Sequence, residues 1–218
     1  MSEVLARVRI DIVSDAICPW CWIGKRNLAG ALEELGWAAE VHWLPYQLNP
    51  DMPREGVDRA AYRTRKFGSL EAAAQKDVQV TQAGAAAGLE FHLAEQKRTP
   101  NTVLAHRLAK FAAEAGVQDD LAEVMFRAYF QEGRDIGDPA VLAELAAGLG
   151  LDAEAFLASD RFEAGVLAED ANFRRIGVNG VPSFALAGHI LFSGAMPPDR
   201  MAAAFRQGHA ILSGKGLI

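Results

Sequence analysis

Cys18-Pro19-Trp20-Cys21 is the segment from which this sequence is best interpreted. It contains both cysteines of the 218-residue chain, and two randomly placed residues would show this spacing in only roughly 1% of cases. A secreted domain held by disulfides would contain more cysteines, placed further apart. A tetrahedral zinc site would need two more ligands, whereas the five histidines are scattered along the chain. The pair therefore indicates redox chemistry, and we predict no metal site.

The position of Cys18 at the start of a predicted helix would activate its sulfur. Residues 8–13 alternate as a strand, and Pro19 suits the first helical position because its missing N–H costs little there. With Cys18 as N-cap, its sulfur would face unpaired backbone N–H groups and the positive end of the helix dipole, which favour the nucleophilic thiolate. Cys21 would lie one turn later, within reach of a disulfide. We predict Cys18 as the nucleophile and Cys21 as the resolving cysteine, with Pro19 and Trp20 tuning the redox potential.

Working outward from this segment, strand and helix patterns alternate near both ends of the chain. Gly36 should end the first helix, and Pro45 places the second strand at a sheet edge or a bulge. Ala187-Gly188 predicts a tight turn between two later strands. The predicted strands cover about 8–13, 41–46, 181–186 and 189–193, and the predicted helices about 18–35 and 197–208.

The middle of the chain, from about residue 58 to 176, has a helical and alanine-rich pattern. Thr99-Pro100 looks like an N-cap followed by proline, and an apolar stripe follows it at helical spacing. The predicted helices cover about 100–115, 119–132, 139–148, 153–158 and 161–176. We therefore predict an α/β fold with an all-helical subdomain inserted into it.

Two motifs resemble those of the DsbA-like thioredoxin superfamily, and of its FrnE-like branch in particular. The first is the run from Asp15 to Arg26, and the second is Gly177-Val178-Asn179-Gly180-Val181-Pro182-Ser183-Phe184. Two weaker signatures are Asn101-Thr102 through Ala105-His106, and Ser193-Gly194-Ala195. The resemblance implies a thioredoxin-like domain formed by residues 1–52 and 177–218, interrupted by a helical insertion domain at 53–176.

The resemblance also implies which residues bind substrate. Val181–Pro182 should be a cis peptide that faces the cysteines and presents backbone groups to an extended substrate. Asn101 is a candidate for lining the cleft, whereas His106 lies about 140° away on the same predicted helix and suits packing or the surface. Met196 stands where the branch commonly has glutamine. We therefore do not predict a polar side-chain contact at this position. The predicted substrate-binding residues are Pro19, Trp20, Val181, Pro182 and Asn101.

These residues predict a thiol–disulfide oxidoreductase that acts on disulfide- or thiol-bearing proteins or on small thiols. The cysteine pair would need no cofactor, and glutathione is a candidate co-substrate. A glutathione-dependent isomerase or transferase remains an alternative, although such proteins typically have serine in place of Cys18 and lack Cys21. A redox-switched binding or chaperone module is a third reading. The direction of electron flow and the oligomeric state stay open.

Charge and hydropathy limit the classes of partner and the cellular location that we expect. With 22 basic and 28 acidic residues the chain carries a net charge of -6, which disfavours nucleic acid and anionic membranes. No apolar run is long enough to span a membrane. Arg7, Arg9 and Asp11 interrupt what would be the apolar part of a signal peptide. We therefore expect a cytoplasmic protein.

Overall fold

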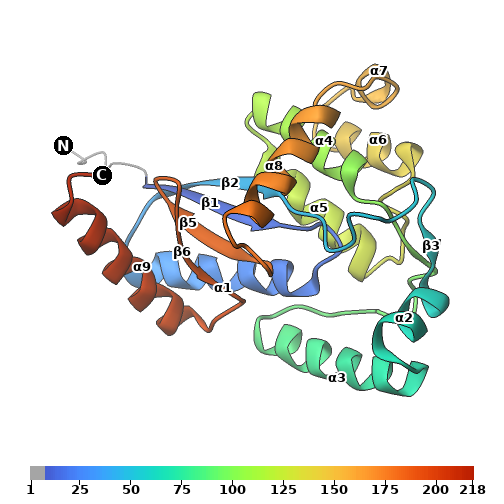
Figure 1. Ribbon diagram of the computed structural model, residues 1–218, viewed down its shortest axis with the longest axis horizontal. Helices are drawn as coiled ribbons and strands as arrows, with labels where there is room; N and C mark the ends of the chain where they lie inside the picture. The colour runs from blue at the N-terminus through green and yellow to red at the C-terminus, as the bar shows by residue number, and fades with distance from the viewer. Residues whose placement is uncertain (1–7) are drawn as a thin grey trace.

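A four-stranded mixed sheet forms the centre of the computed structural model, which describes residues 8–218 (Figure 1). The strand order is β2-β1-β5-β6. β1 (Val8–Ser14) pairs in parallel with β2 (Ala39–Pro45) and antiparallel with β5 (Ser183–Leu186), which pairs antiparallel with β6 (His189–Ser193). Pro45 thus ends an edge strand, as predicted. Arg7, on which the signal-peptide argument partly rests, lies outside the described residues.

Helices cover both faces of this sheet. α1 (Pro19–Leu35) packs against α9 (Pro198–Gly214) on one face. Three helices of the insertion lie against β2 on the other face: α4 (Val103–Glu114), α5 (Gln118–Phe130) and α8 (Glu163–Arg175) (Figure 1). α1 begins after Cys18 with Pro19 in its first turn, and ends at Gly36, whose left-handed φ of 64° is readily adopted by glycine. Both predicted boundaries of α1 are confirmed.

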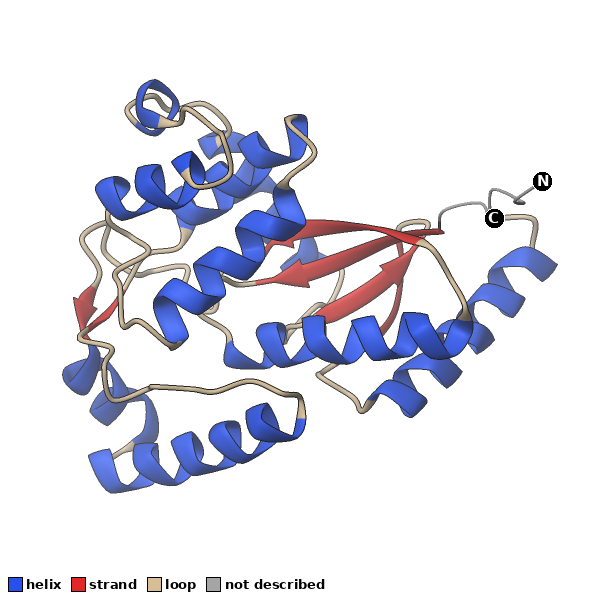
Figure 2. Cartoon of the chain, turned by 180° about the vertical axis from the view of Figure 1, so that it is seen from behind, coloured by secondary structure: helices blue, strands red, loops and turns tan. Residues whose placement is uncertain are grey.

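The insertion between β2 and β5 is helical apart from one short ladder. Figure 2 shows α2 and α3 set apart from the other helices, and we call this pair the α2–α3 arm (residues 59–86). A two-stranded ladder, β3 with β4, lies at its base. The elements are β3 (Val57–Asp58), α2 (Arg59–Phe67), α3 (Leu70–Ala86), β4 (Arg98–Thr99), α4 (Val103–Glu114), α5 (Gln118–Phe130), α6 (Pro139–Ala147), α7 (Glu154–Leu157) and α8 (Glu163–Arg175).

Two predicted helix boundaries are wrong. Thr99 does not cap a helix, because it belongs to β4; α4 begins at Val103, after Thr102. The last helix does not end at Gly208 but continues to Gly214. At Gly208 a Cβ atom would lie 2.6 Å from Leu191 Cδ1, so the glycine allows close packing against β6 and does not end the helix.

One hydrophobic core runs through the sheet and the insertion. Trp22 of α1 joins the two parts, since its ring stacks against Phe126 and Phe130 of α5 at centroid distances of 6.2 and 6.1 Å. Phe91 meets the same ring edge-on at 5.4 Å. Residues 53–176 therefore share a core with the sheet-forming part. Among the helices of residues 8–218, none is both long and apolar enough to cross a membrane.

Candidate active site

Cys18 occupies the N-cap of α1, as predicted. Its backbone is extended, with φ −94° and ψ 110°, and its side chain makes no capping hydrogen bond. Its Sγ–H donates instead to the carbonyl oxygen of Val181 at 3.5 Å, although the two residues are 163 positions apart. Both cysteines are free thiols in the structure. The sulfur of Cys18 is thus placed at a helix N-terminus and beside the loop before β5.

Cys21 lies one turn further along α1 and is completely buried. Burial raises the pKa of the Cys21 thiol well above its ordinary value, and Cys18 raises it further through a hydrogen bond and its charge. The Ser14 side chain and the Asp15 backbone oppose this shift more weakly. Because a protonated thiol is a poor nucleophile, Cys21 does not compete with Cys18 for a first attack.

Val181–Pro182 is a cis peptide, as the resemblance implies. α1 approaches this loop very closely at Gly24. A Cβ atom on Gly24 would lie 2.9 Å from Pro182 Cγ and 3.2 Å from Phe184 Cζ. A glycine at position 24 is therefore what lets the helix that carries both cysteines pack directly against the Pro182 ring.

A cavity of about 430 Å³ opens beside Cys18. Pro19, Trp20 and Val181 line it together with Cys18, and Trp20 is 39% exposed. The α2–α3 arm forms the facing side with polar and apolar side chains. These are Arg59, Tyr62, Arg63, Lys66, Phe67, Lys76, Asp77, Gln79 and Val80. Cys21 does not line the cavity, so Cys18 alone of the two cysteines faces a space that a substrate could occupy.

Asn101 lies away from this cavity. It precedes α4 and borders a separate hollow of about 920 Å³. Its amide donates to the carbonyl oxygen of Met52 at 2.7 Å, and its Oδ1 accepts from the backbone N–H of Val103 at 2.9 Å. These bonds hold the loop before α4. Within residues 8–218, Met196 makes a polar contact only through its backbone oxygen, which accepts from the Asn27 amide at 2.8 Å.

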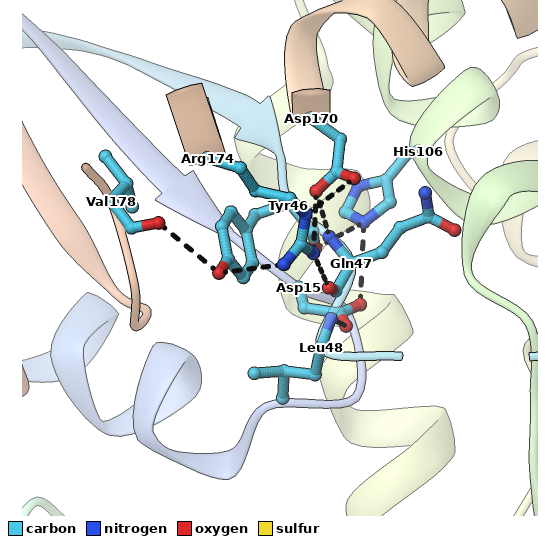
Figure 3. Close-up of polar contacts among 8 residues, drawn as sticks. All are labelled: Asp15, Tyr46, Gln47, Leu48, His106, Asp170, Arg174 and Val178. Carbon is cyan, nitrogen blue, oxygen red and sulfur yellow. Dashed lines mark hydrogen bonds and ion pairs between the residues drawn. The ribbon is translucent and has the colours of Figure 1, made fainter. Parts of the chain in front are cut away.

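A buried polar network lies behind the active-site turn (Figure 3). Asp15 is completely buried, and its Oδ2 accepts from the backbone N–H of Leu48 at 2.7 Å. His106 Nε2 lies 3.2 Å from the Tyr46 carbonyl oxygen and 3.5 Å from Asp15 Oδ1. His106 is thus buried and has the packing role that its position on the helix suggested.

The second half of this network joins α8 to the end of β2. Asp170 accepts from the backbone N–H of Gln47 at 2.9 Å and pairs with Arg174 at 3.1 Å (Figure 3). The hydrogen bond that Arg174 donates to the Asp170 carboxylate raises the pKa of Arg174. Arg174 also donates to the Tyr46 hydroxyl at 3.2 Å, and that hydroxyl donates to the carbonyl of Val178 at 3.5 Å. The network therefore links the insertion to the loop that leads to Val181.

Charged contacts also fix α5 against α1. The Trp22 indole N–H lies 3.3 and 3.2 Å from the two carboxylate oxygens of Glu123. Arg26 pairs with the same carboxylate, and Lys25 pairs with Asp119 at 2.7 Å. The sequence pattern flagged Trp22, Lys25 and Arg26 only as part of a motif, and it gave no signal for their acidic partners. Among residues 8–218, no group of three or more His, Cys, Asp or Glu side chains could hold a metal ion.

Comparisons with known proteins agree with this architecture. The family model for the DSBA-like thioredoxin domain matches residues 9–206. The uncharacterized protein YwbO of Bacillus subtilis is 30% identical over 152 residues, which cover 68% of this chain and 70% of that protein.

Solved structures are similar over almost the whole chain. A probable DsbA oxidoreductase from Streptomyces coelicolor has a TM-score of 0.80 at 30% identity and covers 94% of this chain and 91% of its own. A putative protein disulfide isomerase from Nitrosomonas europaea has a TM-score of 0.72 at 18% identity, with coverages of 96% and 98%. The cytosolic disulfide reductase DsbM from Pseudomonas aeruginosa, solved with GSH, has a TM-score of 0.58 at 22% identity, with coverages of 97% and 100%. The last two similarities concern the fold.

Proposed function

Because the chain belongs to the DsbA-like thioredoxin domain family, we propose that it is a thiol–disulfide oxidoreductase whose reacting groups are Cys18 and Cys21. One observation carries this proposal: Cys18 caps α1 and, although the residue is only 3% exposed, lines a cavity, whereas Cys21 lies one turn further along the helix, is fully buried and does not line it. A nucleophile facing a substrate space, with a shielded second thiol next to it, is the arrangement that two-step disulfide exchange requires.

The reaction proceeds by two exchanges between sulfur atoms. The Cys18 thiolate attacks one sulfur of a substrate disulfide, the substrate S–S bond breaks, and the leaving sulfur takes a proton. Cys21 then loses its proton and attacks the Cys18 sulfur of the mixed disulfide, which releases the second substrate thiol and forms a Cys18–Cys21 disulfide. Two electrons pass from the protein to the substrate. The reverse sequence oxidises a substrate dithiol, and no cofactor takes part in either direction.

Substrate would lie along Pro19, Trp20 and the Val181–Pro182 peptide. Three of these residues line the cavity with Cys18, and the Val181 carbonyl already accepts a hydrogen bond from the Cys18 sulfur. The exposed Trp20 ring offers an apolar surface to a bound chain. We do not assign substrate binding to Asn101, because its side chain is used in the loop before α4.

A cytoplasmic location is part of this proposal. Arg9 and Asp11 lie within β1 and form an ion pair at 2.8 Å, so this segment serves as a strand of the fold. A cytoplasmic glutathione pool would keep the cysteine pair mainly reduced, which favours work as a reductase or isomerase.

Turnover of a protein disulfide tests the proposal. The wild-type protein should reduce insulin in the presence of a small thiol, and the Cys18→Ser variant should reduce it no faster than the thiol alone. Ser213→Ala, a change on the exposed end of α9, serves as the control and should match wild type. Unchanged activity in Cys18→Ser would refute the proposed chemistry.

A further inference from the structure

The cavity beside Cys18 is positively charged on its far side, although the chain as a whole is acidic. Four cationic side chains of the α2–α3 arm line it: Arg59, Arg63, Lys66 and Lys76. Of the residues that the structure describes, Asp77 is the one carboxylate that lines the cavity, while the chain carries a net charge of -6. The local excess of positive charge therefore runs against the composition of the protein.

The single carboxylate is already engaged. Asp77 Oδ1 lies 2.6 Å from an Arg63 guanidinium nitrogen, which also donates to the Ala73 carbonyl at 2.6 Å. The nearest Asp77 oxygen to Arg59 is 3.9 Å away. Within residues 8–218, no ion pair involves Lys66 or Lys76. Lys66 and Lys76 thus lack a carboxylate partner, and Arg59 has only a distant one in Asp77.

Arg59 is the most enclosed of these three. Its side chain is 13% exposed, and its Nε donates to the carbonyl of Leu93 at 3.3 Å. A guanidinium binds a carboxylate through two parallel hydrogen bonds, and such bonds are stronger where water is largely excluded. Lys66 and Lys76 are exposed and would attract an anion over a longer range.

The rest of the cavity suits a small molecule. Its volume of about 430 Å³ falls in the ~300–1,000 Å³ range of small-ligand sites. Phe67, Val80 and Leu93 add apolar side chains to the cavity lining. Resting on the function proposed above, we propose that this cavity selects low-molecular-weight thiols that carry carboxylates, together with their disulfides. The sulfur lies at Cys18 and the carboxylate at Arg59, Lys66 and Lys76.

Such a thiol reduces the oxidised protein back to its dithiol form. One thiolate attacks Cys18 of the Cys18–Cys21 disulfide, the bond between the cysteines breaks, and Cys21 takes a proton. A second thiolate attacks the sulfur of the bound compound, which leaves as a symmetrical disulfide, and Cys18 is released as a thiolate. The two thiols together lose one electron pair, and the protein disulfide gains it.

The test compares thiols that differ mainly in charge. Rate constants for reduction of the oxidised protein are measured with 3-mercaptopropionate (anionic), 2-mercaptoethanol (neutral) and cysteamine (cationic), each divided by its own thiolate fraction. In wild type the anionic thiol should react fastest and the cationic thiol slowest, and the difference should shrink at high salt. In the Lys66→Gln/Lys76→Gln variant the ratio of the anionic to the neutral rate constant should fall about tenfold.

Arg65→Gln provides the matched control, because Arg65 lies on the same helix, is exposed and does not line the cavity. Its ratio should stay within about twofold of wild type. An unchanged ratio in the double variant, or an equal fall of the ratio in Arg65→Gln, would contradict the proposed selectivity for anionic thiols. The proposed disulfide exchange would not be affected by either result. Failure of all three thiols to reduce the protein instead contradicts the proposed function, and the selectivity falls with it.

Discussion

Trp22, which directly follows Cys21, directs its indole N–H at the carboxylate of Glu123 on α5, with N–O distances of 3.2 and 3.3 Å. The contact joins residues 101 positions apart. Glu123 also pairs with Arg26 and, at 3.8 Å, with Lys25, so one carboxylate holds three side chains of the helix that carries both cysteines. This contact therefore helps to fix the insertion relative to the helix that carries the cysteines.

Replacing Glu123 with Gln should loosen this attachment. The change keeps the size of the side chain but removes the charge that Arg26 and Trp22 bind, and the carboxylate is only 16% exposed. We expect a loss of about 1–2 kcal/mol in the free energy of unfolding, measured by urea denaturation. Glu34→Gln, at an exposed position of α1, should change stability by less than about 0.5 kcal/mol. Equal effects of the two changes would show that Glu123 has no special role.

Gly24→Ala should disturb the site itself. The added methyl group would lie 2.9 Å from Pro182 Cγ, so either α1 or the Pro182 loop must shift. Overpacking of this kind costs about 1–3 kcal/mol, and we expect slower insulin reduction as well, because Cys18 and Val181 would separate. Gly165→Ala is the control, since a Cβ there meets open space on α8. Gly165→Ala should preserve activity and slightly stabilise the protein; wild-type behaviour of Gly24→Ala would contradict the close packing.

The buried Cys21 thiol predicts a pH dependence for the reduced protein. Because burial raises the pKa of Cys21, the folded state keeps a proton that the unfolded chain releases near pH 9.0. Stability from this group is therefore complete below that pH and is lost as the pH rises above it, by at most about 1.4 kcal/mol per pH unit.

Urea unfolding of the reduced wild type and of Cys21→Ala, at several values between about pH 8 and 10, isolates this effect. Stability of wild type should fall more steeply with pH than stability of the variant. Parallel slopes would show that Cys21 ionises equally in the folded and unfolded states.

Asp170→Ala should destabilise the link between α8 and β2. The change leaves the buried N–H of Gln47 without its acceptor and removes the carboxylate that pairs with Arg174. We expect a loss of about 2–3 kcal/mol in unfolding free energy, and a smaller loss for Asp170→Asn, which keeps an oxygen for Gln47. Asp160→Ala, at an exposed position, is the control. A loss below about 0.5 kcal/mol in Asp170→Ala would mean that water replaces the carboxylate without cost.

The parts of the fold that the sequence predicts well are those with local signals. Pro19 and Gly36 bound α1, and Pro45 marks the edge strand, because each fixes the backbone or lacks a donor at its own position. The β3–β4 ladder was not predicted, since strands of two residues show no periodicity. Gly208 was misleading because its reason lies in Leu191, a neighbour in space and not in sequence.

The same distinction holds for the candidate site. Cys18 and Cys21 are close in sequence, and the Val181–Pro182 motif was recognisable from the resemblance, so the structure could be anticipated there. The cations Arg59, Lys66 and Lys76 were not singled out, because about 40 residues or more separate them from Cys18 and only the folded α2–α3 arm brings them to its cavity. Asn101 was expected near the cleft as part of α4, but that helix starts two residues later and Asn101 serves its preceding loop.

Trapping of the mixed disulfide tests the central claim, the division of roles between the two cysteines, most directly. Reduced Cys21→Ser and Cys18→Ser proteins are each mixed with a small symmetrical disulfide, quenched with acid, and weighed by mass spectrometry under native and denaturing conditions. In the native state Cys21→Ser should gain one thiol adduct rapidly, whereas Cys18→Ser, whose remaining thiol is buried away from the cavity, should gain it only after denaturation. Equal rates of adduct formation in the two native variants, or none in either, would contradict the account.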